Sequence, residues 1–424
     1  MTFDWTHTPW LGHDAVDWGI VAVFVLVYLG MFLGGLPRLK LDRSGVALLG
    51  AIAVIALAGL PVEEAAQSVD LPTLVLLFAF MVVSAQMRLG GFYTAVTQRV
   101  GAMSMPRIGL LAALIAVAGG LSAVFSNDIV CLAMTPVVAR MCLQRGFDPV
   151  PFLVGLACAA NIGSAATLIG NPQNMLIGSV LQLSFGGYLA QALPPVLLSL
   201  VFLWGWLAYG PGARTGSPSG VPAAAVDPSP DEQPVFDAWQ TAKGLTVALV
   251  LMGVFLFTDW PRDVAALVGA GVLLLSRKLH SSHVMGLVDW PLLLLFIGLF
   301  VVNHAFETTG LAAQAVQWLG ERGVVPSDPG PLLVLGVGLS NLVSNVPAVM
   351  LLLPHLGVDA VRAGTALALI STFAGNLLLV GSIANLIVAD MARRQGIEID
   401  WRRHLRIGLP VTLGSLGLLA LFLF

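Results

Sequence analysis

Long apolar stretches separated by short polar ones fill most of this chain. Eight of them run without interruption over 19–36, 45–61, 72–87, 190–209, 243–258, 264–279, 291–306 and 407–424. A helix needs about 20 apolar residues to cross a bilayer. The pattern therefore predicts a polytopic membrane protein built from helices.

Four further apolar regions are interrupted near their middle. The regions at about 108–143 and 330–356 are broken only at Ser126-Asn127-Asp128 and at 344–347. Each of these polar segments is too short to form an aqueous loop. Both regions are predicted to be re-entrant hairpins. The regions at about 152–183 and 363–390 contain longer polar and glycine-rich runs, and each is predicted to be a broken transmembrane helix. This gives ten crossings and two hairpins.

The chain is predicted to be an internal duplication. Residues 43–101 align with 262–320 without a gap, and Asp70-Leu71-Pro72 falls on Asp289-Trp290-Pro291. The interval that begins at Ser126 recurs from Ser344, and 167–174 recurs more weakly as 378–385. We therefore expect a first repeat at 1–210, a cytoplasmic linker at 211–242 rich in Gly, Pro, Ser and Ala, and a second repeat at 243–424.

The charges predict an orientation. With the N-terminus outside, all but Arg262, Arg322 and Arg362 of the 20 lysines and arginines fall on the inner side, as the positive-inside rule requires. Five crossings per repeat then make the two copies inverted. The expected fold is an all-α polytopic membrane protein of two inverted repeats, each with five transmembrane helices and one hairpin, in the inner (plasma) membrane with both termini outside.

Composition excludes several classes of protein. Charged residues make up 10% of the chain and hydrophobic ones 57%, with a net charge of −3, which is unlike a soluble enzyme or a nucleic-acid-binding protein. No cofactor, metal site or catalytic group is predicted. Inverted repeats with broken helices are typical of secondary transporters. A duplicated scaffold, a channel or an intramembrane enzyme is the alternative, but neither a selectivity filter nor a nucleophile-and-base arrangement is visible.

The four interruptions are predicted to face one another and to form the binding site, because broken backbone at membrane depth must be buried in protein or line a wet cavity. Their Ser, Asn and Pro residues are those that begin helices, whose free N–H groups attract solutes. The candidate contacts are Ser126, Asn127, Asp128, Asn161, Gly163, Thr167, Gly170, Asn171, Asn174, Ser344, Asn345, Val346, Pro347, Asn376, Gly381, Ser382 and Asn385.

Asp128 is the one carboxylate clearly inside the hydrophobic zone, which makes it the candidate for proton coupling. The alternative is that it only caps a hairpin helix, but the matching position in the second repeat is Val346, and a capping need would recur in both copies. His304 and Cys131 are interpreted as packing residues.

The stretches 125–136, 161–174 and 344–347 resemble the ion-transporter superfamily, in particular the branch of arsenite efflux permeases (ArsB) and NhaD-type sodium/proton antiporters. In sodium-coupled dicarboxylate relatives the hairpin tips carry Ser-Asn-Thr and bind substrate and sodium. The resemblance implies such contacts for Ser126, Asn127, Ser344 and Asn345, whereas Asp128 and Val346 depart from that pattern. It also implies an elevator-type or rocking motion and a homodimer.

A dianion beside an ionised Asp128 is electrostatically unfavourable even with helix dipoles of about half a charge. Arsenite, largely uncharged As(OH)₃ at neutral pH, or a cation fits better. The sequence therefore predicts arsenite efflux by proton antiport, with sodium/proton exchange second and sodium-coupled anion transport third.

Overall fold

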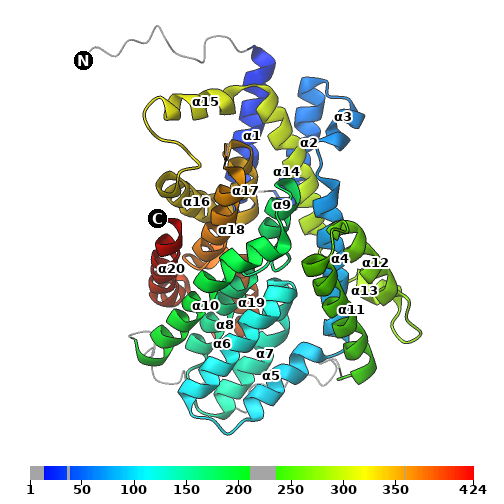
Figure 1. Ribbon diagram of the computed structural model, residues 1–424, viewed down its shortest axis with the longest axis vertical. Coiled ribbons are helices and arrows are strands. Elements are labelled where there is room, and N and C mark those ends of the chain that lie inside the picture. Colours follow the sequence, from blue (N-terminus) through cyan, green and yellow to red (C-terminus); the bar gives the residue numbers. More distant parts are fainter. Residues whose placement is uncertain (1–13, 36–38, 211–234, 358) are drawn as a thin grey trace.

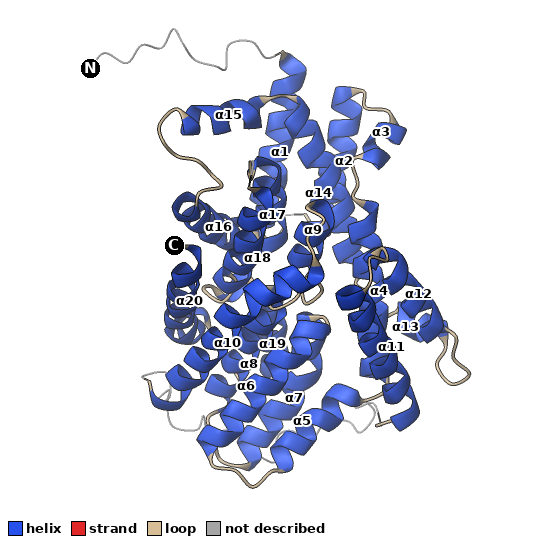
Figure 2. Cartoon of the chain, viewed as in Figure 1, coloured by secondary structure: helices blue, strands red, loops and turns tan. Residues whose placement is uncertain are grey.

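The computed structural model describes residues 14–35, 39–210, 235–357 and 359–424, and every regular element in these ranges is a helix (Figure 2). This architecture confirms the all-helical class, whereas the inverted orientation of the two repeats stays a prediction. Most of the predicted linker at 211–242 lies outside the described residues. Helices α15 and α5 lie at opposite ends of the long axis of the molecule (Figure 1).

Each of the eight uninterrupted stretches forms a helix. Seven helices in the described residues are long and apolar enough to cross a membrane, six of them among the eight and the seventh in a hairpin region. The eight are α1 (Ala15–Leu33), α2 (Arg43–Ala58), α4 (Leu71–Leu89), α10 (Phe185–Tyr209), α11 (Ala238–Phe257), α12 (Arg262–Leu274), α14 (Trp290–Thr308) and α20 (Trp401–Leu423).

The interrupted regions break into two helices each at the polar residues. In the predicted hairpins only Phe125 and Ser126, or Ser344 alone, separate the two helices; in the predicted broken helices the gaps are longer. The helices are α6 (Arg107–Val124) with α7 (Asn127–Gln144), α16 (Pro329–Val343) with α17 (Asn345–Leu352) and the 3₁₀ turn η5 (Leu353–His355), α8 (Pro149–Ser164) with α9 (Pro172–Val180), and α18 (Ala360–Ala374) with η6 (Leu379–Gly381) and α19 (Ile383–Arg393).

Four short helices were not predicted because they are too short or too polar to look like spans. They are α3 (Val62–Gln67), α5 (Phe92–Ala102), α13 (Ser281–Met285) and α15 (Leu311–Gly320). Helices α5 and α15 follow Gly91 and Gly310, whose φ angles are +68° and +74°. Glycine adopts this left-handed conformation without a steric cost, so the chain turns at the same aligned position in both halves.

The order of helices α1–α10 recurs as α11–α20. Helix α2 packs against α14, and its counterpart α12 packs against α4, the counterpart of α14. This exchange of partners is what a two-fold relation between the halves requires. The α2–α14 contact is close because Gly298 has no side chain: a Cβ there would lie 2.6 Å from the carbonyl carbon of Ala47.

Helices α8 and α18 form the centre of the molecule. Every residue of α8 is buried, and α18 is buried from Ala363 to Ala374. Both are almost wholly apolar up to their last turn, so burial favours them along most of their length. Their few polar side chains, Asn161 and Thr372 among them, are therefore held inside the protein.

Candidate functional site

Asn161, near the end of α8, connects both halves of the molecule through its side-chain amide. Its Nδ2 donates to Oδ1 of Asn376 at 2.9 Å and to Oδ1 of Asn385 at 3.2 Å. Its Oδ1 accepts from Nδ2 of Asn127 at 3.2 Å and from Oγ of Ser382 at 3.0 Å. The structure thus brings five of the predicted site residues together in one buried network.

A second set of hydrogen bonds mirrors part of this network. Asn171 begins α9 and donates its Nδ2 to Oγ1 of Thr372 in α18 at 3.3 Å. Ser382 begins α19 and donates to Asn161 in α8. Ser382 and Thr372 stand 211 positions after Asn171 and Asn161 respectively. Each half therefore supplies a helix-capping residue that bonds to the central helix of the other half.

The weaker part of the sequence repeat has the same structural basis. Nδ2 of Asn174 donates to the carbonyl of Thr167 at 2.9 Å, and Nδ2 of Asn385 donates to the carbonyl of Leu378 at 3.1 Å. In both halves an asparagine inside the second helix thus ties down the loop that precedes it. The hydroxyl of Thr167 in turn donates to the carbonyl of Ala123, next to the first hairpin tip.

Two of the predicted glycines lie at backbone crossings. A Cβ on Gly163 would clash with the backbone of Gly119 in α6, and one on Gly170 would clash with the carbonyl oxygen of Ser164. A Cβ on Gly381 would lie 2.9 Å from Oδ1 of Asn341. Close packing accounts for the small residue at each of these positions.

The two hairpin tips differ. The N–H of Ser126 donates to Oγ of Ser84 in α4 at 3.1 Å, and Asn127 joins the network. At the second tip Ser344 has a φ of +82°, a conformation that is rare for a residue with a side chain and is typical of functional sites. Asn345 lies beside Gly375 but makes no side-chain hydrogen bond with any described residue. Val346 and Pro347 are buried in the first turn of α17.

Five asparagine amide atoms around the breaks are buried without a hydrogen-bond partner in the described part of the chain. They are Oδ1 of Asn127, Asn174, Asn341 and Asn345, and Nδ2 of Asn376. Buried polar atoms in proteins are nearly always paired, so an unpaired one calls for an explanation such as a bound solute or water. These atoms offer acceptors and a donor to a small polar ligand.

Asp128 lines a cavity of about 150 Å³ between α4, α7, α9, the start of α14 and α19, together with Ser126, Gly170 and Asn171. Its carboxylate accepts no hydrogen bond from any described residue. The N-cap position of α7 is occupied by Ser126, and Asp128 lies inside the first turn of the helix. The side chain is therefore available to a ligand rather than engaged in helix capping.

Two charged residues of this cavity were missed by sequence reasoning. Arg88, at the end of α4, and Asp289, at the start of α14, line the wall with Asp128. The wall then carries two carboxylates and one guanidinium. Arg88 was only counted among the arginines of the inner side, and Asp289 was recognised only as a repeat of Asp70. Neither pattern contained a signal that the two would lie beside Asp128.

The C-terminal end of α9 is attached to two neighbouring helices. Oγ of Ser179 donates to Oδ1 of Asp70 at the start of α4 at 3.0 Å. The guanidinium of Arg262 at the start of α12 donates to the carbonyl of Gly178 at 2.8 Å. These contacts hold α9 against α4 and α12 at the end where α4 begins, in the wall of a cavity of about 700 Å³ that Ser179 and Arg262 line.

The counterparts of these contacts are not made in the second half. Among the described residues, the carboxylate of Asp289 accepts only from the N–H of Leu292. In the described part of the chain, the guanidinium of Arg43 makes no hydrogen bond, and Asp390, which replaces Ser179, pairs only with Arg393 and Arg394. The end of the molecule where α14 begins, beside the Asp128 cavity, thus lacks counterparts of the contacts that Ser179 and Arg262 make at the other end.

Comparison with protein families gives one matching model. Residues 26–357 match CitMHS, the citrate transporter family. The matched range covers α2 to α17 completely, and with them both hairpins and the first broken helix.

Several curated proteins are similar to this chain. An uncharacterised transporter of Mycobacterium tuberculosis, Rv2685, is 31% identical over 84% of this chain and 86% of its own length. The silicon efflux transporter LSI3 of Oryza sativa is 30% identical over 93% of this chain and 95% of its own. A putative transporter of Dictyostelium discoideum, arsB, is 23% identical over 89% of this chain and 86% of its own length.

Among solved structures, the YdaH transporter of Alcanivorax borkumensis is similar in fold. The TM-score is 0.60 over 96% of this chain and 98% of that one, at 15% sequence identity. At this identity the likeness concerns the fold alone.

Proposed function

The chain belongs to the citrate transporter family CitMHS and is a secondary transporter of the multi-pass membrane type; within that class we propose that it exports arsenite in exchange for protons. The family match confirms the resemblance to ion transporters, and the arsenite proposal goes one step beyond it. Its family and relatives are transporters rather than enzymes. We place it in the inner (plasma) membrane, with both termini outside. The proposal includes two inverted repeats, at 1–210 and 243–424, and assembly as a homodimer.

The observation that carries the proposal is the charge and size of the Asp128 cavity. Two carboxylates and one guanidinium, from Asp128, Asp289 and Arg88, give its wall a formal net charge of −1. A citrate or other multivalent anion would be repelled by this wall. A water molecule takes up about 30 Å³ in the liquid, so a volume of about 150 Å³ suits a solute of a few heavy atoms.

An uncharged hydroxide matches the polar groups of the cavity wall. The hydroxyls of As(OH)₃ both donate and accept hydrogen bonds, and the wall offers Ser126, Asn171 and the carboxylate of Asp128. The unpaired amide atoms of Asn127, Asn345 and Asn376 lie at the breaks, outside this wall. The names of two relatives support this class, since one is a silicon efflux transporter and another is called arsB. Silicic acid, also a small uncharged hydroxide, is therefore the second candidate substrate.

Asp128 would couple the two fluxes by exclusive occupancy. An ionised carboxylate accepts a hydrogen bond from a hydroxyl of the solute, whereas protonation replaces an acceptor site by a donor. Binding of arsenite and binding of a proton at Asp128 then oppose each other, which is the requirement for exchange. A proton taken up outside would be released inside, and arsenite would travel the other way.

The different ends of the molecule support alternating access. In the proposed orientation the hydrogen bonds of Ser179 and Arg262 close the outer side, while the Asp128 cavity lies towards the inner side beside Asp289. The arrangement is that of an inward-facing carrier. Exchange of these contacts between the two ends, by a rocking or elevator-type motion, would present Asp128 to the outside.

Flux in everted vesicles tests the proposal. Under an imposed pH gradient, arsenite is expected to dissipate the gradient and to accumulate inside the vesicles. Dissipation by sodium alone would instead identify a sodium/proton antiporter, and sodium-dependent succinate or citrate uptake would identify an anion transporter. Silicic acid, tested in parallel, distinguishes an arsenite exporter from a general exporter of uncharged hydroxides.

A further inference from the structure

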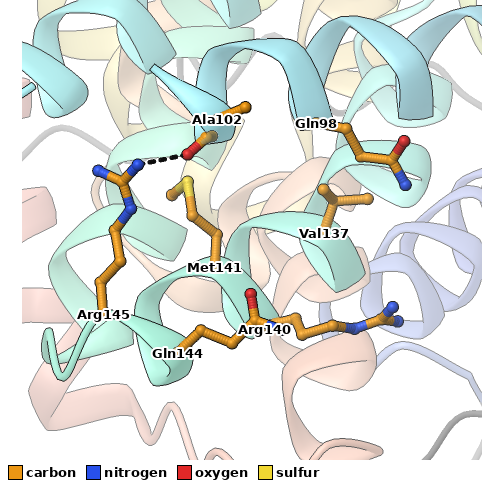
Figure 3. Close-up of a pocket in the computed structure, with 8 residues that line it drawn as sticks. Gln98, Ala102, Val137, Arg140, Met141, Gln144 and Arg145 are labelled. Atoms are coloured by element: carbon orange, nitrogen blue, oxygen red, sulfur yellow. Dashed lines mark hydrogen bonds between the residues drawn. The ribbon is translucent and has the colours of Figure 1, made fainter. Parts of the chain in front are cut away.

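A second cavity, separate from that of Asp128, lies between α5 and α7. Its volume is about 330 Å³, and it shares no lining residue with the Asp128 cavity. Helix α5 provides Gln98 and Ala102, and α7 with its last turn provides Arg140, Gln144 and Arg145 (Figure 3). Helix α5 lies at the end of the molecule opposite α15 (Figure 1), the end that the arginine distribution assigns to the inner side of the membrane.

The polar part of this cavity is cationic. Two guanidinium groups and two side-chain amides line it, and the lining residues of the described chain include no Asp or Glu. Nε of Arg140 is buried without a hydrogen-bond partner. Figure 3 shows the Arg140 side chain extended below Gln98, so a guanidinium and an amide end on the same side of the cavity.

Arg145 is held differently. Its guanidinium donates to the carbonyl of Gly101 at 2.5 Å, the dashed bond in Figure 3. It also donates to the carbonyl of Met103 at 2.8 Å, directly after the end of α5. These bonds satisfy carbonyls that a helix C-terminus leaves unpaired, and they attach α5 to α7. Arg145 therefore fixes the walls of the cavity and contributes positive charge, whereas Arg140 is the guanidinium that remains free to bind.

The rest of the wall is apolar. Ala102, Val137 and Met141 form it, and the neighbouring Met103 is 47% exposed. A cavity with a cationic end and an apolar end that continues onto an exposed methionine fits an amphiphile better than a free ion. At the inner face of a membrane the abundant anionic amphiphiles are phospholipids, and basic pockets between helices bind their head groups.

We propose that the cavity between α5 and α7 binds the phosphate head group of an anionic phospholipid of the inner leaflet. Arg140 and Gln98 would hold the phosphate oxygens, and Ala102, Val137 and Met141 would contact the glycerol and the first part of the acyl chains. Helix α5 joins α4 to the first hairpin. An occupied site would therefore fix α7, the second helix of that hairpin, to the membrane surface.

Native mass spectrometry of the full-length protein in detergent tests this directly. Phosphatidylglycerol, phosphatidylethanolamine and inorganic phosphate would be titrated separately, and phosphate would also be added to the phosphatidylglycerol complex. We expect phosphatidylglycerol to remain bound, with phosphatidylethanolamine several-fold weaker. Equal binding of the two lipids would overturn the proposal, and displacement of the lipid by millimolar phosphate would identify a site for free phosphate instead.

Variants locate the site. Arg140→Gln is expected to weaken phosphatidylglycerol binding about fivefold or more, since a basic residue near an anionic lipid contributes about a factor of five. Arg99→Gln is the control, because Arg99 is an exposed arginine of α5, the helix on the other side of the cavity from Arg140, and does not line the cavity. Equal losses in the two variants would refute the assignment.

A second variant covers the case in which Arg140→Gln does not fold. Gln144 is exposed in the wall, so Gln144→Glu adds a negative charge without disturbing buried packing. It should weaken phosphatidylglycerol binding as well, by like-charge repulsion, and leave phosphatidylethanolamine binding unchanged. Undiminished phosphatidylglycerol binding in Gln144→Glu would contradict the proposal independently of Arg140.

Discussion

The side-chain amide of Asn161, in the first half of the chain, donates a hydrogen bond of 2.9 Å to the side-chain carbonyl of Asn376 in the second half. Asn161 and Asn376 are 2% and 0% exposed, so water cannot replace either partner. The contact joins the end of one central helix to the break that follows the other.

Replacement of Asn161 by alanine should destabilise the protein strongly. The change would leave buried polar groups of Asn127, Asn376, Asn385 and Ser382 with fewer or no partners, and each unsatisfied group costs about 1–3 kcal/mol. Thermal unfolding in detergent is the measurement. Ser199→Ala is the control, since Ser199 is equally buried but its hydroxyl has no partner to lose; comparable shifts for the two variants would contradict the network's role.

Asp128→Asn should abolish proton-coupled exchange and leave folding intact. The substitution keeps the size of the side chain and removes its ability to exchange a proton, and no hydrogen bond from a described residue is lost. Flux and gradient collapse in everted vesicles would be compared with Asp359→Asn, which changes an exposed carboxylate that makes no capping bond. Proton coupling of normal size in Asp128→Asn would refute the coupling role.

Ser179→Ala should favour opening of the outer side. It removes the hydrogen bond to Asp70, and one such bond contributes about 1 kcal/mol, or roughly a fivefold change in a conformational equilibrium. A cysteine in place of Leu76, in the wall of the cavity beside these contacts, would report the change through faster labelling by a membrane-impermeant thiol reagent added outside.

The control for this measurement is Thr258→Ala in the same Leu76→Cys background. Thr258 lines the same outer cavity, but its hydroxyl makes only local bonds: it donates to the carbonyl of Val254 in the preceding helix and accepts from the N–H of Trp260. It should leave the labelling rate unchanged. If Ser179→Ala labels no faster than this control, the contact with Asp70 does not hold the outer side closed.

Gly298→Val should separate α2 from α14 and lower the stability by about 1–3 kcal/mol, the usual cost of overpacking. A Cβ at this position would meet the backbone of Ala47, which cannot move aside as a side chain can. The yield of monodisperse protein and the unfolding temperature would measure the effect. Gly271→Ala serves for comparison, because a Cβ there meets nothing within 4 Å, and it should be tolerated.

The helices could be predicted because hydrophobic burial acts along the chain and leaves a local pattern. Each uninterrupted apolar stretch became a helix, and the interruption at Ser126 separates α6 from α7 as expected. Helices α5 and α15 were missed because a helix of 11 or 10 residues with polar side chains has no hydropathy signal of a span.

The candidate site was predicted only as a set of residue types at breaks. That Asn161 would be the shared partner, and that Asp289 and Arg88 would line the wall beside Asp128, depends on packing between segments far apart in sequence. Local patterns contain no information of that kind. The repeat did carry one usable signal, since aligned positions such as Asn171 and Ser382 proved to be equivalent caps.

The crossed caps have an evolutionary consequence. Asn171 bonds to Thr372, and Ser382 bonds to Asn161, so each copy of the ancestral unit is completed by a residue of the other copy. If the halves arose by the predicted duplication, a substitution at one member of such a pair could be accommodated only by a change in the opposite copy. The two halves would therefore have diverged in step, and a chimera that joins the first half of one relative to the second half of another should fail unless these pairs are transferred together.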